Sequence, residues 1–350
     1  MKKIMVTFRK GAENGGPYNS HKRLIESRLK DKYEFIPIYI TNGSIGIFNF
    51  KLLTYIIKSI KEHKPDLVYC TGLQLEGFYY TLASRITKTR SLVIIHGSST
   101  ESTTIKRPKK VIMQMIEFIT LSLATNICAV SEYVNNWSVL RFFEKKKLGV
   151  IYNLGNKGHL KKSFLNENDE VSLITSGRLT KEKGMDKIVE LYNKVSMNTN
   201  KKVKIRILGN GDYREILQKD INFNGLEDKI ELLGYQKNIE RFYNDSDIYF
   251  SLSEHETFGM SILEAAEFGL PIVAFNVGGI PEIVVNNHNG KLVEVNNLDE
   301  FANTICELMD NESLRINMGK NGRMKSNAKF NRDDILNKID EVICEAMLDD

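Results

Sequence analysis

Residues 253–281 read SEHETFGMSILEAAEFGLPIVAFNVGGIP, and this stretch decides the fold class of the chain. The apolar run before it, DIYFSL at residues 247–252, is typical of a buried parallel strand. After Gly259 the apolar residues recur at helical spacing as far as Gly269, and Pro271 ends the helical pattern. Residues 272–275 form a second short apolar run. The stretch therefore predicts a strand, a polar turn, a helix and a second strand, which is the repeating unit of an α/β sheet.

The same alternation of strand-like and helical patterns runs along the whole chain. Apolar strand-like runs occur at residues 3–8, 35–40, 67–69, 92–96, 127–130 and 150–152, and again at 171–176, 203–209, 230–233, 248–252 and 272–275. Residues 153–169, between the two sets, are polar and contain Gly, Asn and Lys, as expected of a link between domains. We therefore expect an α/β protein with two doubly wound parallel-sheet domains, residues 1–155 and 156–331.

Length and composition agree with a two-domain protein. A chain of 350 residues is too long for one typical core, and 42% hydrophobic with 27% charged residues is ordinary for a soluble globular protein. No stretch approaches the roughly 20 apolar residues of a membrane span, and the N-terminal apolar run is too short for a signal peptide. Four scattered cysteines fit no CxxC pattern and are expected to be reduced core residues: Cys70, Cys128, Cys306 and Cys344. We expect a cytoplasmic protein with no structural metal and no cofactor.

Charge is distributed unevenly between the two halves. Residues 1–155 contain 24 Lys and Arg against 11 Asp and Glu, a net charge of +13, whereas residues 156–350 contain 25 against 33, a net charge of −8. Such asymmetry indicates domains with different partners. The basic half could face nucleic acid, an anionic membrane surface or phosphate-bearing substrates. Nucleic acid ranks last, because no nucleic-acid-binding motif is visible.

Two glycine-containing loops are candidate anion sites. Residues 175–184, TSGRLTKEKG, place Arg178 and Lys183 after a strand and before a helix, where the helix dipole does not favour cations. A bound anion explains them better, and a bidentate arginine beside a mobile lysine suits a pyrophosphate. Gly15 and Gly16 precede a helix predicted to begin near Pro17, and they fit either an anion loop or a plain tight turn. The GNG of residues 209–211 predicts a tight turn rather than an NAD site, because Arg214 stands at the third glycine position.

Together these motifs resemble those of the retaining glycosyltransferases of family 4, most densely over residues 171–295. The resemblance implies the GT-B fold, in which two Rossmann-like domains face a central cleft. It implies a nucleotide-sugar donor, of which a UDP-sugar is the expected kind, on the second domain. It also implies an acceptor on the first domain, and a C-terminal helix at about 332–350 that packs back on that first domain.

Site residues follow from the resemblance, position by position. Glu256 is expected near the donor sugar and Glu264 on the ribose hydroxyls, eight residues apart, while Arg178 and Lys183 would neutralise the leaving diphosphate. Gly16 and Gly259 would let the backbone approach that diphosphate. Phe258 belongs to the same donor turn. Tyr235 is the last residue of LGY (residues 233–235), at the end of a predicted strand, and is expected to contact the nucleotide base.

His96 and a basic helix belong to the first half of the chain. His96 ends the run LVIIH, and the family has a histidine at the matching strand end, so we expect it to hydrogen-bond a sugar hydroxyl; a structural histidine is the alternative. Residues 106–125 begin with four cations, Lys106, Arg107, Lys109 and Lys110, before an apolar helix. They indicate either an acceptor or membrane-surface contact, or a core helix with a solvated basic end.

The leading hypothesis is a retaining, metal-independent transferase that moves a sugar from a nucleotide-sugar to a glycan or a lipid-diphosphate-linked acceptor. Low Pro with high Lys, Asn and Ile suggests an AT-rich bacterial genome. With the basic half, this favours cell-surface polysaccharide assembly, such as capsule or lipopolysaccharide, with possible peripheral contact at the anionic inner face of the plasma membrane. The alternatives are a sugar-nucleotide epimerase of the same fold and a non-catalytic, sugar-nucleotide-binding subunit of a transferase complex.

Overall fold

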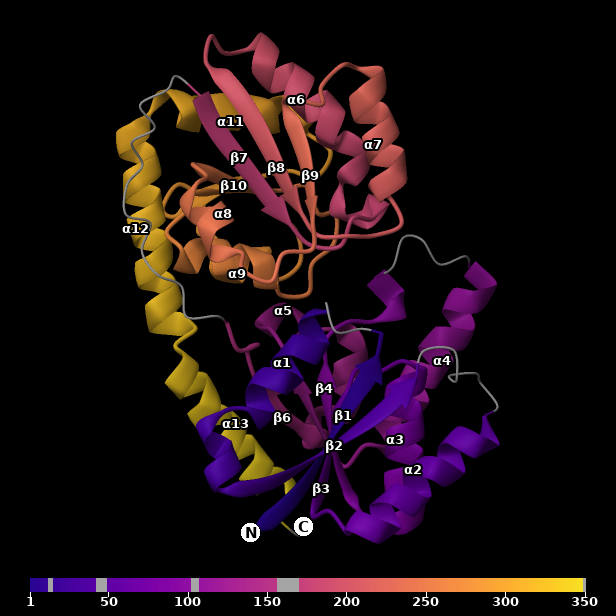
Figure 1. Cartoon of the computed structure of the whole chain (residues 1–350). Helices are drawn as coiled ribbons and strands as arrows, with labels where there is room; N and C mark the ends of the chain where they lie inside the picture. Colours follow the sequence, from indigo (N-terminus) through magenta and orange to yellow (C-terminus); the bar gives the residue numbers. More distant parts are fainter. Residues whose placement is uncertain (12–14, 42–48, 102–106, 156–169, 349–350) are drawn as a thin grey trace. The chain divides into compact units, whose positions relative to one another are not determined.

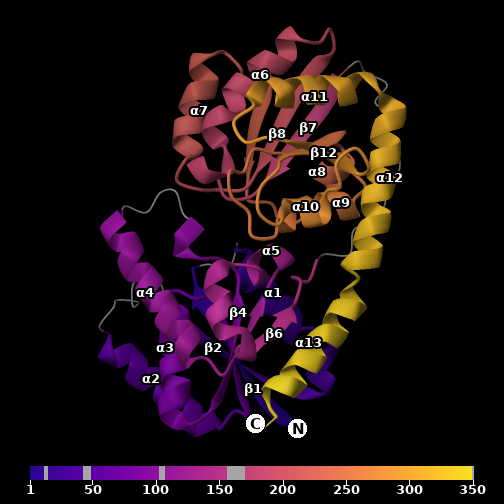
Figure 2. The ribbon, with the colours of Figure 1, turned by 180° about the vertical axis from the view of Figure 1, so that it is seen from behind.

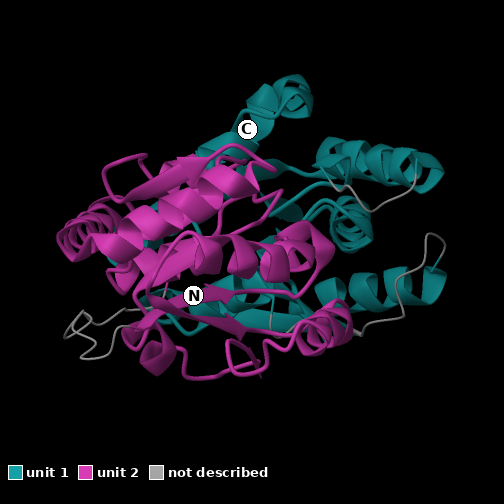
Figure 3. Ribbon diagram, turned by 90° about the horizontal axis from the view of Figure 1, so that it is seen from above, with its two compact units in different colours: residues 1–154, 331–350 teal, residues 155–330 magenta. Residues whose placement is uncertain are grey.

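The computed structural model describes residues 1–11, 15–41, 49–101, 107–155 and 170–348 (Figure 1). The chain divides into two compact units (Figure 3). Unit 1 contains residues 1–154 and 331–350, and unit 2 contains residues 155–330. Within the described residues each unit is built on one six-stranded sheet, and every strand pair is parallel. The predicted α/β class with two doubly wound sheets is confirmed.

Unit 1 has the strand order β2-β1-β3-β4-β5-β6. Its helices alternate with its strands, because each βα crossover returns the chain to the same edge of a parallel sheet. The elements are β1 (Lys2–Lys10), α1 (Gly16–Ile25), η1 (Arg28–Asp31), β2 (Tyr33–Thr41), α2 (Phe50–His63), β3 (Leu67–Thr71), α3 (Leu75–Thr87), β4 (Arg90–Ile95), η2 (Ser99–Glu101), α4 (Arg107–Leu123), β5 (Asn126–Ala129), α5 (Glu132–Asn135), η3 (Ser138–Lys146), β6 (Lys147–Val150) and, after unit 2, α13 (Arg332–Ala346).

Unit 2 has the strand order β12-β11-β10-β7-β8-β9. The chain builds outward from β7 in one direction and then returns to the other side of β7 with β10. The elements are β7 (Glu170–Ser176), η4 (Lys181–Lys183), η5 (Met185–Lys187), α6 (Ile188–Met197), β8 (Lys202–Leu208), α7 (Arg214–Phe223), β9 (Ile230–Gly234), α8 (Glu240–Asn244), β10 (Ile248–Ser251), α9 (Met260–Glu267), β11 (Ile272–Phe275), α10 (Ile280–Ile283), β12 (Gly290–Val293), α11 (Leu298–Asp310) and α12 (Glu312–Lys329).

The structure corrects several predicted details. The strand expected at residues 150–152 lies earlier, at Lys147–Val150. The sequence patterns do not predict β12, which is labelled in Figure 2. The helix expected directly after Arg178 and Lys183 begins only at Ile188, after two short 3₁₀ turns. Most of the expected link, residues 156–169, lies outside the described residues. Three of the four cysteines are buried as expected, but Cys344 is exposed.

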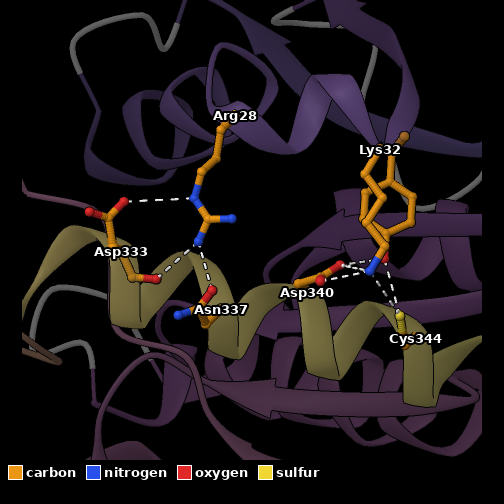
Figure 4. Close-up of polar contacts among 7 residues, drawn as sticks. Arg28, Lys32, Asp333, Asn337, Asp340 and Cys344 are labelled. Carbon is orange, nitrogen blue, oxygen red and sulfur yellow. Dashed lines mark hydrogen bonds and ion pairs between the residues drawn. The ribbon is translucent and has the colours of Figure 1, made fainter.

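Helix α13 is attached to unit 1 by an apolar face and by a polar edge, and Figure 4 shows the contacts of the polar edge. Its buried residues include Ile339, Val342 and Ile343. On the polar edge Lys32 Nζ lies 2.7 Å from Asp340 Oδ2, and the hydroxyl of Tyr33 donates to Asp340 Oδ1 at 2.5 Å. The edge also contains Arg28 with Asp333 and Asn337, and Cys344 with Lys32 and Tyr33. The last helix is therefore an integral part of unit 1.

Among the described residues, no helix combines the length and the apolar character needed to cross a bilayer.

Candidate active site

The reversal of strand order in unit 2 brings the ends of β7 and β10 together. Open α/β sheets bind ligands at the carboxyl ends of strands on either side of such a reversal. Arg178 lies two residues after β7, and Glu256 lies five residues after β10. Lys183 lies in η4, on the segment that leaves β7. Three of the predicted site residues therefore lie on the segments that leave β7 and β10 at this reversal.

A salt bridge joins two of these residues. The Lys183 ammonium contacts Glu256 Oε1, and it also donates to the carbonyl oxygen of His255 at 3.4 Å. The side chains are 20% and 16% exposed, so the pair is mostly screened from solvent. Because the two residues are 73 positions apart in sequence, only the sheet topology could bring them together.

A second salt bridge lies beside the first. Lys187 Nζ lies 2.5 Å from Glu254 Oε1 and 3.6 Å from Asp186 Oδ1. Burial acts to lower the pKa of Lys187, but hydrogen bonds and charge from Glu254 and Asp186 outweigh it and raise the pKa above its ordinary value. The sequence motifs do not predict Lys187 or Glu254 as site residues. The available signal was their spacing: Lys187 follows Lys183 by four residues, and Glu254 precedes Glu256 by two.

Glycines allow these loops to approach each other. Gly184 has φ of +72°, and a Cβ there would lie 2.4 Å from both Cβ and the carbonyl oxygen of Leu252. Gly279 donates its N–H to the carbonyl oxygen of Glu256 at 3.0 Å, and a Cβ on Gly278 would lie 1.8 Å from that same oxygen. The GG pair therefore fixes the backbone of the glutamate turn, and Gly184 lets the lysine loop pack against the end of β10.

Helix α9 begins immediately after this turn. Gly259 is its N-cap residue, with φ of +99° in the left-handed region that favours glycine. Phe258 is buried and packs edge-on against Phe330 with ring centroids 5.5 Å apart, so only its backbone could meet a ligand. Glu264 is half-buried on α9. Since the helix begins at Met260, Glu256 lies in the preceding loop and only Glu264 lies on the helix.

The remaining residues predicted in unit 2 lie at neighbouring strand ends. Arg178 is exposed and has no ion-pair partner within the described part of the chain. Tyr235 directly follows β9 and is 47% exposed. Between them, the GNG of residues 209–211 begins the short link from β8 to α7, in which the backbone N–H of Arg214 donates to the carbonyl oxygen of Gly211 at 3.2 Å. A Cβ on Gly209 would lie 1.8 Å from the carbonyl oxygen of Gly177. The ends of β7, β8 and β9 thus form a closely packed edge that carries an exposed cation and an exposed aromatic ring.

Gly16 and His96 belong to unit 1. Gly16 is exposed in the first turn of α1. His96 follows β4, and its ring centroid lies 5.9 Å from that of His21. Burial, followed by the charge of His21, lowers the pKa of His96 to about 3, so its imidazole is neutral near pH 7.

His21 and Glu117 organise the surroundings of His96, and neither was predicted. His21 is buried, and its Nδ1 lies 3.0 Å from the carbonyl oxygen of Thr7 and 2.9 Å from Thr71 Oγ1. The carboxylate of Glu117, on α4, accepts hydrogen bonds at 2.6 Å from Ser98 Oγ and from the backbone N–H of Ser99. The loop after His96 is therefore fixed to the neighbouring helix.

The basic helix is α4. Arg107 and Lys109 are exposed and Lys110 is half-buried, whereas Lys106 lies outside the described residues. Within the described part of the chain, no group of three or more His, Cys, Asp or Glu side chains could hold a metal ion.

Sequence comparison now adds a family to this geometry. Residues 156–325, nearly all of unit 2, match the family described as glycosyl transferases group 1. The chain belongs to this family. It is accordingly a glycosyltransferase of family 4, whose members retain the anomeric configuration of the sugar and need no metal ion.

Similar proteins include three bacterial relatives. N-acetyl-alpha-D-glucosaminyl L-malate synthase of Bacillus anthracis is 30% identical over 55% of this chain, and the match spans half of that protein's length. The capsular polysaccharide biosynthesis glycosyltransferase CapM of Staphylococcus aureus is 25% identical over 85% of this chain and 82% of its own. An Escherichia coli UDP-Gal:alpha-D-GlcNAc-diphosphoundecaprenol alpha-1,3-galactosyltransferase is 27% identical over 88% of this chain and 81% of its own.

A solved structure agrees with the fold. HepE of Anabaena, determined in complex with UDP and glucose, superposes with a TM-score of 0.78 over 99% of this chain and all of its own, at 19% identity. At this identity the likeness supports the GT-B fold of the chain and nothing more specific.

Proposed function

We propose that this protein transfers a sugar from a UDP-sugar to a glycan or lipid-diphosphate-linked acceptor in the assembly of a bacterial cell-surface polysaccharide. The names of its relatives support this: one acts in capsular polysaccharide biosynthesis, and another transfers galactose from UDP-Gal to a GlcNAc-diphosphoundecaprenol. HepE was determined with UDP bound. The reaction would take place in the cytoplasm, where sugar nucleotides are made.

The observation that carries this proposal is the cation pair at the strand reversal of unit 2. Arg178 is exposed and unpaired within the described residues, and Lys183, five residues further along the chain, is held in place by its salt bridge to Glu256. Bond cleavage in a sugar nucleotide leaves a diphosphate that gains negative charge. A guanidinium and an ammonium placed in advance would stabilise that charge without reorganisation. In this role Lys183 would share its ammonium between Glu256 and the phosphate.

The remaining residues of unit 2 would hold the donor. The N-terminus of α9, with Gly259 as its cap, offers backbone N–H groups to an anion, and the backbone of Phe258 adjoins it. Glu264 would bind the ribose hydroxyls, and Glu256 would orient the sugar. Tyr235 would contact the base.

Unit 1 would bind the acceptor and provide two further contacts to the donor. Gly16 would allow the backbone at the start of α1 to approach the diphosphate. His96, kept neutral by burial, would hydrogen-bond a sugar hydroxyl without adding a charge. Retention would follow from attack of the acceptor on the face that the diphosphate leaves, with the departing phosphate accepting the proton of the acceptor hydroxyl.

A donor screen tests the proposal. Purified protein would be incubated with UDP-, GDP- and ADP-sugars, and slow nucleotide release would be followed by mass spectrometry beside the Glu256→Gln variant. We expect release from a UDP-sugar, strongly reduced in the variant. Release accompanied by an isomerised sugar nucleotide would instead favour an epimerase. Absence of both release and thermal-shift binding for every donor would favour a non-catalytic subunit.

A further inference from the structure

The outward face of α4 carries a row of large apolar side chains. Five of them are between 43% and 61% exposed: Val111, Ile112, Met115, Phe118 and Ile119. At about 100° per residue these positions fall within an arc of roughly 120° on the helix. The opposite face of α4 is buried in unit 1 through Ile116 and Leu121, so the helix is apolar on two sides. A helix of this kind is normally covered on both sides, yet here one side faces solvent.

A second element extends this apolar row. Phe143 of η3 packs edge-on against Phe118 of α4, with ring centroids 5.2 Å apart. Lys146, at the end of η3, donates to the carbonyl oxygens of Ser122 and Ala124 at 2.6 and 2.8 Å, which satisfies the C-terminal end of α4. Phe142, which is also in η3, is 78% exposed. We call the five exposed residues of α4 together with Phe142 the α4 patch.

Cations surround the α4 patch, and acidic residues are almost absent from its two elements. Arg107 and Lys109 on α4, and Arg141 and Lys145 on η3, are exposed, and none of them has an ion-pair partner among the residues that the structure describes. The single acidic residue of α4, Glu117, is buried and hydrogen-bonded to the Ser98 loop. The single acidic residue of η3, Glu144, pairs with Lys147 at 3.0 Å.

The stability of the fold does not account for this arrangement. The helix dipole does not favour cations at the start of α4, and exposed apolar side chains gain nothing from contact with water. Contiguous exposed apolar surface with a polar rim marks a site of interaction with a protein or a membrane. A second copy of this chain would bring the same basic rim against itself, and the like charges would repel. An anionic surface into which apolar side chains can insert satisfies both features.

We propose that unit 1 docks peripherally on an anionic lipid surface through the α4 patch, with its apolar side chains inserted between the headgroups and its cations on the lipid phosphates. This differs from a purely electrostatic contact of the basic start of the helix, because most of the binding free energy comes from the apolar row. It adds a location to the proposed function, since a lipid-linked acceptor is held at such a surface.

Vesicle co-sedimentation tests the proposal with the full-length protein. The vesicles would contain equal amounts of phosphatidylglycerol and phosphatidylcholine, or phosphatidylcholine alone. The wild type should bind the anionic vesicles and bind less well as salt is raised. The double variant Met115→Glu with Ile119→Glu should bind at least about tenfold more weakly. Replacing Arg107 and Lys109 by Gln should weaken binding and reduce its dependence on salt.

The matched control places the same two changes on unit 2. Met197→Glu with Phe223→Glu replaces side chains that are 83% and 91% exposed, adds the same charge, and should leave vesicle binding unchanged. Absence of wild-type binding, or equal binding by the two double variants, would overturn the proposal. So would a wild-type dimer, seen by analytical ultracentrifugation, that the Met115 and Ile119 changes dissociate while lipid binding is absent. The assay contains no sugar nucleotide, so its failure would leave the donor screen unaffected.

Discussion

At the scale of single residues, the charged side chains of unit 2 depend on glycines that permit close contact between loops. Gly184 brings the lysine loop against the end of β10, and Gly278 lies against the backbone of Glu256. The salt bridge of Lys183 with Glu256 forms across that contact. Substitution at these glycines should therefore affect both stability and the donor site, although none of them carries a functional group.

Gly184→Ala is expected to lower the free energy of unfolding by about 2–5 kcal/mol, because Cβ adds left-handed backbone strain and overlaps Leu252. Gly225→Ala is the matched control, since Gly225 has φ of +63° and nothing within 4 Å of its Cβ position. That variant should lose only the strain of about 1–2 kcal/mol. Urea unfolding measures both variants, and equal losses would contradict the role given to the Leu252 contact.

The pH dependence of stability should report on the buried histidines of unit 1. Burial lowers the pKa of His21 from 6.5 to about 4. The unfolded chain therefore binds this proton at a higher pH than the folded chain does. The stability of the folded chain that depends on neutral His21 is fully present above pH 6.5. As the pH falls to 4, the free energy of unfolding decreases by up to about 3 kcal/mol.

A His21→Gln variant tests this assignment. It should show a shallower decline in the free energy of unfolding across the same pH window, although His96 continues to contribute. Urea titrations at several pH values would measure the slope for the variant and for the wild type. Identical slopes would show that His21 does not cause the decline.

At the scale of secondary-structure elements, α13 shows how a distant segment completes unit 1. Its apolar face is buried, whereas its polar edge joins Asp340 to Lys32 and Tyr33. Although burial opposes it, hydrogen bonds from Lys32 and Tyr33 hold the pKa of Asp340 below its ordinary value. Asp340 therefore contributes to the stability of the folded chain when the pH is above the ordinary carboxyl pKa, and this contribution is lost as the pH falls below that pKa. Because the polar edge is partly exposed, the apolar face should dominate the attachment.

Ile343→Ala is expected to cost about 2–4 kcal/mol, whereas Asp340→Asn should cost about 1 kcal/mol. Both changes should speed hydrogen exchange in residues 332–346, and the first should do so more. Lys338→Ala removes only the exposed pair with Glu341 and should cost less than about 0.5 kcal/mol. A larger effect from Asp340→Asn than from Ile343→Ala would reverse the ranking of the two faces.

At the scale of the whole molecule, the sequence predicts the two sheets well because buried parallel strands are nearly continuous apolar runs. It misses β12, since the run GKLV is short and contains a lysine. It also misses the partners of Lys187 and His96, because these contacts join segments that only the topology brings together. The basic start of α4 was visible in sequence, but periodicity alone could not show which of its two apolar faces is exposed.

Unit 2 is one continuous segment with its own core, whereas unit 1 needs both ends of the chain. A fragment of residues 155–330 should therefore unfold cooperatively, while residues 1–154 without α13 should be markedly destabilised. Circular dichroism during thermal unfolding compares the two fragments. A non-cooperative transition for residues 155–330 would mean that unit 2 depends on unit 1.

The most direct test of the donor site is a comparison of UDP and uridine affinities by calorimetry, in the wild type and in Arg178→Gln and Lys183→Gln variants. The ratio of the UDP affinity to the uridine affinity isolates the contribution of the diphosphate. Each variant should lower this ratio about tenfold to a hundredfold and leave uridine binding unchanged. Lys219→Gln, at an exposed lysine of α7, is the matched control and should leave the ratio unchanged. A ratio unaltered by both Arg178→Gln and Lys183→Gln would show that these cations do not bind the diphosphate.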